Sequence, residues 1–190
     1  MVRFVGCIIY DGIGLNLMLL FQDKNIDMTL KEGIDIYQQY LYRHQKKIMI
    51  DQENETLIRN HDATHVIFGL DTTLEEEAML DTWVLFGTNF KFRDLYKYNK
   101  KPEIKDLQKK LFSELGIFGL LRLYKIVLRN KISIFKRTRS MKKKWPFQFP
   151  DSYLDISILK LRDEYGIQIL NAAERSLKER VIWSGTILKI

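Results

Sequence analysis

Two histidines one helical turn apart are the residues of this sequence best suited to chemistry. Residues 61–77 read HDATHVIFGLDTTLEEE, which places His61 and His65 four positions apart and a cluster of glutamates downstream. Histidines at positions i and i+4 project from one face of a helix, so both imidazoles can bind the same divalent cation. A carboxylate from a neighbouring helix would supply a third ligand. The spacing therefore predicts a metal site.

Two consecutive helices are expected to carry this site. Residues 55–68 have the apolar spacing of an amphipathic helix, with both histidines on the apolar face, and Gly69 follows as a typical C-terminal residue. A second helix is expected to begin after Thr72 or Thr73, because each precedes a glutamate by three residues, and to run to about Phe86. The short GLDT link predicts that the two helices pack as an antiparallel pair.

The acidic residues differ in the direction in which they are expected to point. At about 100° per residue, Glu77 and Asp81 lie on the apolar face of the second helix. Glu75 and Glu76 are expected to point away from that face. Asp62, at the edge of the apolar face of the first helix, is expected to be either a fourth ligand or a hydrogen-bond partner of a histidine. Histidine and carboxylate ligands suit zinc, iron or manganese better than calcium, and an open coordination position would make the site catalytic.

The competing interpretation is that both histidines are hydrogen-bonded core residues and that Glu77 belongs to an ordinary buried ion pair. Burial of two imidazoles and two carboxylates without a cation would leave charge and donors to be compensated, which favours the metal. Other chemistry has less support. HDxxH differs from the HExxH motif of zinc proteases at the position of the catalytic base. The sequence also has no phosphate-binding glycine loop, dinucleotide fingerprint or serine nucleophile elbow.

Length and composition indicate a single globular domain over residues 1–190. The chain is 46% hydrophobic, and its one cysteine, Cys7, excludes an internal disulfide and suggests a reducing, intracellular setting. Asp11 interrupts the apolar N-terminus, so neither a signal peptide nor a spanning helix is favoured there. Further helices are expected over residues 32–47, 105–114 and 155–165, and over most of residues 167–189.

Basic residues are concentrated in one apolar segment. Residues 115–150 contain ten lysines and arginines and no acidic residue. Since the whole chain has a net charge of +7, the residues outside this segment have a net charge of −3. A surface of this kind suits an anionic membrane, and nucleic acid is not favoured because no recognition module for it is present. Trp145 and Phe147, in the loop KKKWPFQFP, are expected to insert at the interface. The alternative for the stretch LGIFGLLRLYKIVL is a core helix with a solvated basic side.

The metal motif also carries a family likeness. Its pattern is H-D-x-x-H followed after eleven residues by glutamate, and it is matched by His61, Asp62, His65 and Glu77. The residues RNHD, a G-x-x-T turn after the motif and the segment LRDEYGI at residues 161–167 agree with the same family. In these features the sequence resembles the ubiquinone (coenzyme Q) biosynthesis family founded by the fourth of the Coq proteins. The resemblance covers about residues 57–167, and Glu76 stands where that family usually has glycine.

The resemblance implies an all-α, bundle-like fold with an apolar lipid-binding groove and a bound divalent metal ion. The metal ligands would be His61, Asp62, His65 and Glu77. It also implies a cytoplasmic protein, peripheral on the inner membrane, that binds a polyprenylated quinone precursor. The implied activity is oxidative decarboxylation, which replaces a ring carboxylate by a hydroxyl. Members of the family also organise a quinone-biosynthesis complex, and the chain is a candidate homo-oligomer.

Three functions stay open from the sequence. The first is a metal-dependent enzyme of ubiquinone biosynthesis. The second is a non-catalytic scaffold that binds a prenyl lipid and uses the metal structurally, and the third is an enzyme that acts on another prenylated or fatty lipid. Arg59 is a candidate to pair with a substrate carboxylate, but its position on the helix points away from the site.

Overall fold

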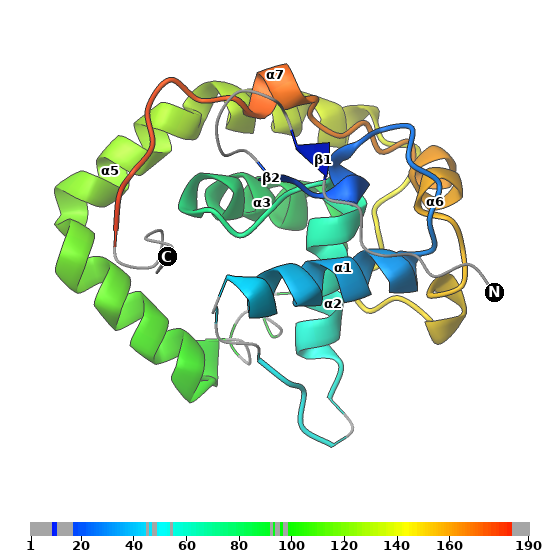
Figure 1. The fold of residues 1–190 in the computed structure, drawn as a ribbon, viewed down its shortest axis with the longest axis horizontal. Helices are drawn as coiled ribbons and strands as arrows, with labels where there is room; N and C mark the ends of the chain where they lie inside the picture. Colours follow the sequence, from blue (N-terminus) through cyan, green and yellow to red (C-terminus); the bar gives the residue numbers. More distant parts are fainter. Residues whose placement is uncertain are drawn as a thin grey trace.

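The computed structural model describes residues 9–10, 17–44, 46, 49–53, 55–91, 93, 96 and 99–183. In these ranges the fold is all-α, as predicted, with one short antiparallel pair of strands. Helix α3 lies in the middle of the molecule, and the long helix α5 curves around the outside (Figure 1). The elements are β1 (Ile9–Tyr10), β2 (Leu17–Met18), η1 (Leu20–Gln22), α1 (Leu30–Arg43), α2 (Leu57–Phe68), α3 (Leu74–Gly87), α5 (Pro102–Ser140), η2 (Asp151–Tyr153), α6 (Ile158–Tyr165) and α7 (Ala172–Arg175).

Helix α2 carries both histidines and is buried over most of its length. Every residue from 63 to 68 is buried. The helix ends at Gly69 as predicted, and the φ of 68° at this position favours glycine. The buried guanidinium of Arg162 donates hydrogen bonds to the carbonyls of Val66 at 2.8 Å and Ile67 at 3.0 Å. These bonds satisfy carbonyls at the C-terminal end of α2 and hold that end in place.

Helix α1 packs across α2 and is held by its own N-terminal cap. Thr29 and Glu32 form a capping box, in which the Glu32 amide donates to the Thr29 hydroxyl at 3.2 Å and the Thr29 amide donates to the Glu32 carboxylate at 2.8 Å. The two helices approach closely at Gly33, where a Cβ atom would lie 2.4 Å from Cγ1 of Val66. Glycine at this position therefore lets the next turn of α1 reach the side of α2 that carries the histidines.

Thr73 is the N-terminal cap of helix α3, so of the two predicted caps, Thr72 and Thr73, the second is the one that forms. The Thr73 hydroxyl accepts a hydrogen bond from the Glu76 amide at 3.4 Å. Glu75 and Glu76 were expected to point away from the apolar face of this helix, and they are nevertheless buried, only 1% and 5% exposed. Glu76 pairs with Arg175 at 3.4 Å, and Glu75 accepts the Val181 amide at 2.6 Å. Residues after α6 thus cover sides of α3 that lie away from its apolar face.

Helix α5 is a long helix interrupted at Gly116, whose φ of 56° and ψ of −172° are not helical. After this break, Leu123, Val127 and Ile134 are buried in the same core cluster as Trp83 of α3. The predicted helix over residues 105–114 is therefore the first part of a much longer element. No helix in the described ranges combines the length and the apolar character needed to cross a bilayer.

The chain after α6 differs from the prediction. A helix over most of residues 167–189 was expected, but between residues 167 and 183 only the four-residue helix α7 forms. The rest of that stretch runs as irregular chain, which supplies the groups that reach Glu75 and Glu76 of α3. Residues 184–190 lie outside the described ranges.

The basic, aromatic loop after α5 also differs from the prediction. Trp145 and Phe147 are buried, 0% and 3% exposed, so the expectation that they insert into a membrane is wrong. The Trp145 ring packs against Tyr165 of α6, with ring centroids 5.1 Å apart. The neighbouring lysines form ion pairs with α6, Lys142 with Asp163 at 3.3 Å and Lys143 with Glu164 at 2.6 Å. The loop therefore joins α5 to α6 rather than forming a free surface.

Candidate metal centre

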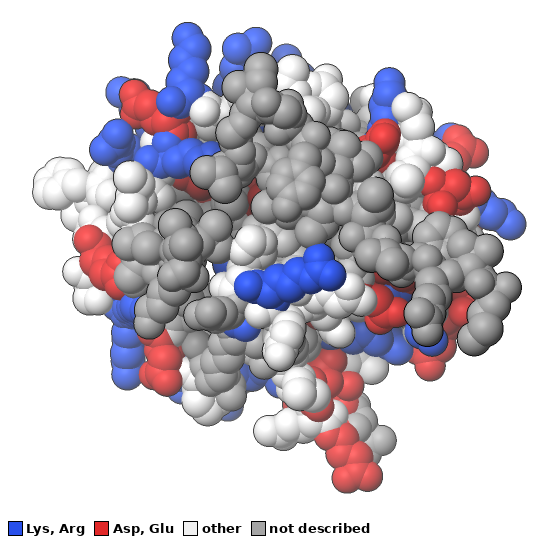
Figure 2. All heavy atoms as spheres, viewed as in Figure 1, with Lys and Arg blue, Asp and Glu red and all other residues white. Residues whose placement is uncertain are grey.

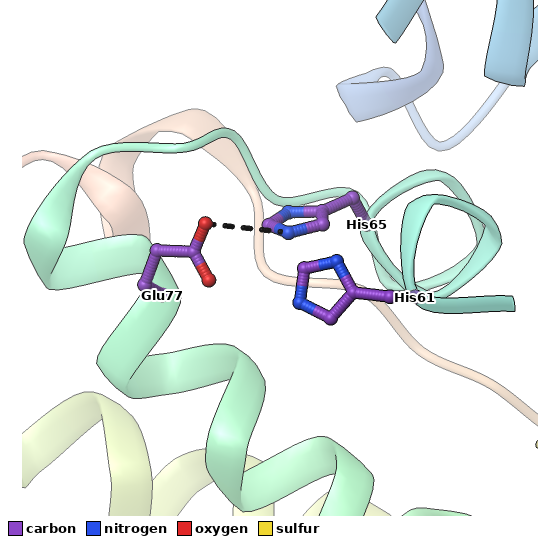
Figure 3. A group of neighbouring side chains, drawn as sticks. All are labelled: His61, His65 and Glu77. Carbon is purple, nitrogen blue, oxygen red and sulfur yellow. Dashed lines mark ion pairs between the residues drawn. The ribbon is translucent and has the colours of Figure 1, made fainter. Parts of the chain in front are cut away.

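Three of the four predicted ligands converge where α2 faces α3. Ligand atoms of His61, His65 and Glu77 all lie within 4.8 Å of one another. Figure 3 shows the two imidazoles side by side on α2, with the Glu77 carboxylate reaching toward them from α3. The two rings meet edge to face, with centroids 4.8 Å apart. The i, i+4 spacing and the short link between the helices thus bring these groups together as predicted.

His65 is held in one orientation by contacts on two sides. Its side chain is fully buried, and its Nδ1 atom lies 3.2 Å from the carbonyl oxygen of Leu70. The Tyr37 ring of α1 stacks on the imidazole, with centroids 4.6 Å apart and an angle of 23° between the planes. If Nδ1 donates its proton to Leu70, Nε2 carries the lone pair. The contact with Leu70 therefore selects the tautomer that a metal ligand needs.

The Nε2 atom of His65 supports the idea that a cation belongs at this site. It is buried and has no hydrogen-bond partner among the described residues. It lies 3.4 Å from Oε1 of Glu77, whereas ligand atoms of a tetrahedral zinc site lie about 3.3 Å apart. Glu77 and His61 are the more accessible members, with side chains 38% and 20% exposed. Small rotations of these two side chains can therefore bring all three ligand atoms to the spacing that a bound cation needs. Two imidazoles and one carboxylate suit zinc and other first-row divalent metals.

The charges of the site reinforce one another. Burial opposes protonation of His65, but the negative charges of Glu77 and Asp62 outweigh it and raise the pKa of the imidazole above its usual value. Burial would raise the pKa of Glu77, but the positive charges of His65, His61 and Lys46 outweigh it and lower the pKa. The site thus favours a positive charge between the histidines and the carboxylate. A proton on His65 and a divalent cation would compete for that place.

Asp62 lies beside the converging groups rather than among them. Its side chain is nearly buried, and one carboxylate oxygen accepts a hydrogen bond from Nε2 of Gln38 on α1 at 3.0 Å. The other oxygen lies 3.9 Å from Nδ1 of His61. At 3.9 Å the carboxylate attracts a charged His61 but does not hydrogen-bond to it, so of the two roles expected for Asp62 the structure favours a partner of His61 over a metal ligand.

Two lysines reach the neighbourhood of the carboxylates from distant parts of the chain. Nζ of Lys46 donates to the carbonyl of Thr72 at 2.9 Å and to its hydroxyl. Nζ of Lys131 on α5 donates to the carbonyl of Ala78 at 2.5 Å. Asp81 is exposed, but it lies on the same side of α3 as Glu77, as predicted, because it interacts electrostatically with Glu77, with Lys131 and with both histidines. The spacing within α2 and α3 gave no signal for either lysine, because both come from other elements.

Arg59 takes no part in the site. Its guanidinium pairs with Asp151 at 2.7 Å and lies over the Phe149 ring, 4.9 Å from the centroid. The prediction that it points away from the histidines is therefore confirmed.

The chain matches no family model, no curated protein and no solved structure. The family likeness therefore depends on the motif residues alone, and the apolar lipid-binding groove that it implies stays a prediction.

Proposed function

We propose that the protein binds a divalent metal ion through His61, His65 and Glu77 and acts in ubiquinone biosynthesis on a ring precursor that carries a polyprenyl chain. The observation that carries the proposal is the buried Nε2 of His65, which lacks a hydrogen-bond partner among the described residues and lies 3.4 Å from Glu77. At this distance Glu77 forms an ion pair with a protonated His65 without a hydrogen bond, and a cation bound between the two groups would take the place of that proton. The match to the family motif supplies the pathway and the substrate class.

The protein groups would prepare the site for an oxygen-bearing ligand. Leu70 and Tyr37 hold His65 in position, Asp62 lies behind His61, and Glu77 neutralises part of the added charge. A divalent cation bound here would act as a Lewis acid on a carboxylate or phenol oxygen of the ligand. Three protein ligands leave at least one coordination position for that oxygen. The exposed part of Glu77 marks the side from which a ligand would approach.

The proposed reaction is an oxidative decarboxylation of the ring. The bond between the ring carbon and the carboxylate breaks, carbon dioxide leaves, and the ring carbon gains a hydroxyl. This change removes two electrons from the ring: with water as the source of the hydroxyl oxygen, dioxygen would accept the two electrons and two protons and become hydrogen peroxide. The protein would hold the carboxylate and the ring in place and exclude competing reactions.

The proposal is tested by metal analysis and turnover of the same preparation. We expect about one divalent ion per chain in the wild type and a strong loss in His65→Ala. His44→Ala is a matched control, because His44 lies at the C-terminal end of α1 outside the cluster and should leave the metal content unchanged. Incubation with a polyprenylated hydroxybenzoate labelled at the carboxylate should release labelled carbon dioxide in the wild type and not in His65→Ala.

The outcomes separate the alternatives that the sequence left open. A bound metal and a bound prenyl lipid without release of carbon dioxide would favour the non-catalytic scaffold. Turnover of another prenylated lipid in place of the hydroxybenzoate would favour the third function. Retention of a full complement of metal by both His65→Ala and Glu77→Gln would exclude this site as the metal centre.

A further inference from the structure

Helix α5 has a second apolar face that no described part of the protein covers. After the break at Gly116, six large apolar side chains recur at intervals of three and four residues along about 27 Å of helix. They are Ile117, Leu121, Tyr124, Leu128, Ile132 and Phe135, and we call them the apolar stripe. All six are exposed, Leu121 and Leu128 by 59% and 54%. Exposed apolar residues are normal when scattered, but a continuous row of them marks an interaction surface.

The apolar stripe is not the face that holds α5 to the protein. That face is formed by Leu123, Val127 and Ile134, which are at most 3% exposed and belong to the core. The helix is therefore apolar on two sides, and the fold accounts for only one of them. The stripe also continues onto α3, because Phe86 meets Phe135 edge to face with ring centroids 5.0 Å apart. Phe86 is itself 46% exposed.

Basic residues run alongside the stripe. Lys125, Arg129 and Lys136 are exposed and follow one another at helical spacing, and they form no ion pair with any described residue. Arg122, on the same side, forms an exposed ion pair with Glu179 at 3.0 Å. Figure 2 shows Lys and Arg side chains projecting from the rim of the molecule, where Figure 1 places α5. We call Lys125, Arg129 and Lys136 the basic row.

We propose that the apolar stripe of α5 docks on an anionic lipid bilayer, with the helix parallel to the membrane plane. The apolar stripe would enter the boundary between headgroups and acyl chains, and the basic row would contact anionic headgroups. Charge decides between this partner and a second copy of the chain. Two copies that met through the same face would bring two unpaired basic rows close together, whereas a bilayer rich in anionic lipid neutralises them.

The docking surface adjoins the candidate metal centre. Lys131 lies at the edge of the stripe, with Nζ 5.0 Å from the centroid of the Tyr124 ring, and the same Nζ donates to the carbonyl of Ala78. Ala78 follows Glu77 directly on α3. The biological purpose of docking rests on the proposed function, because a prenylated substrate resides in a bilayer and docking would bring the metal centre to it. Its physical basis, the exposed stripe and the unpaired charges, is independent of any metal.

Co-sedimentation with vesicles tests the docking. The full chain should bind vesicles of phosphatidylcholine mixed with phosphatidylglycerol and bind vesicles of phosphatidylcholine alone much more weakly. The triple variant Lys125→Gln/Arg129→Gln/Lys136→Gln should bind anionic vesicles roughly 100-fold more weakly, as expected for the loss of three charges near a membrane. The matched control Lys24→Gln/Lys31→Gln/Lys160→Gln removes the same charge from exposed positions on other elements and should bind like the wild type.

The stripe has its own variants and readout. Leu121→Ser/Leu128→Ser changes two exposed positions, so the fold should persist by circular dichroism while vesicle binding falls at least about tenfold. Tyr124→Trp should show a blue shift of its fluorescence when anionic vesicles are added. His61→Ala should bind vesicles normally, so a failure of docking and a failure of the metal proposal can be told apart.

Three results would overturn the docking proposal. The first is equal binding of the triple variant and its matched control. The second is a Tyr124→Trp spectrum that anionic vesicles do not change. The third is a wild-type dimer that becomes monomeric in Leu121→Ser/Leu128→Ser without vesicle binding by either, which would assign the stripe to a second copy of the chain.

Discussion

The Nε2 atom of His65 lies 3.4 Å from the Oε1 atom of Glu77, and these two atoms join consecutive helices at the candidate metal centre. The imidazole is fixed from behind by Leu70 and Tyr37, whereas the Glu77 carboxylate is partly open to solvent. One side of the site is therefore rigid and the other adjustable. This asymmetry leads to predictions for metal binding and for the packing that supports it.

Metal affinity should fall as the pH is lowered through the pKa of His65. That pKa is raised above the usual value for histidine, so a proton occupies Nε2 over a wider pH range than in a free imidazole. Glu77, whose pKa is lowered, stays charged throughout that range. Calorimetric titration with zinc in buffers of different ionisation enthalpy should reveal proton release on binding. Release should be greatest below the pKa of His65 and vanish at high pH, and a release independent of pH would contradict the assignment.

Asp62→Asn should weaken metal binding about 10- to 100-fold without abolishing it. The reason is that Asp62 lies beside His61 and binds Gln38, so its loss frees the ring without removing a converging ligand. His65→Ala, in contrast, should remove measurable binding. Competition with a chelator of known affinity measures both variants. If Asp62→Asn loses metal as completely as His65→Ala, Asp62 is a ligand and the orienting role is wrong.

Arg162→Leu should destabilise the fold by about 3 kcal/mol, because it leaves buried carbonyl groups without donors. The guanidinium donates to Phe21, Val66 and Ile67 and is 4% exposed. Urea denaturation at neutral pH measures the change. Arg43→Leu, at an exposed position in the last turn of α1, is the matched control and should change stability by less than about 0.5 kcal/mol. Similar effects of the two variants would show that Arg162 does not support α2.

Gly33→Ala should destabilise the packing of α1 on α2 by about 1–3 kcal/mol. The new Cβ atom would lie 2.4 Å from Cγ1 of Val66, so one helix must move. Such a movement should also separate Tyr37 from His65 and lower metal affinity. The double variant Gly33→Ala/Val66→Ala removes the clash, so its metal affinity should recover even though the smaller core side chain costs stability. An equally low affinity in the single and double variants would argue against steric control by this contact.

The sequence by itself determined which residues share a face of α2 and α3. Helical periodicity, the stop at Gly69 and the short link to Thr73 are local properties, and they were sufficient to bring His61, His65 and Glu77 together. The same periodicity placed Glu75 and Glu76 on other sides of α3 but gave no indication that they would be buried. It identifies the most apolar side of a helix, but it does not say which other sides will be covered.

Only the tertiary structure decided those covered sides. Arg175 and Val181 reach the α3 carboxylates from about 100 residues away, and Arg162 reaches the end of α2 from a similar distance. The aromatic loop with Trp145 is buried because it packs against α6. The apolar stripe of α5, in contrast, is not covered by any described residue. Contacts between distant segments depend on how whole elements pack, because burial and ion pairing are satisfied across elements. A local residue pattern does not specify which distant segments will pack against it.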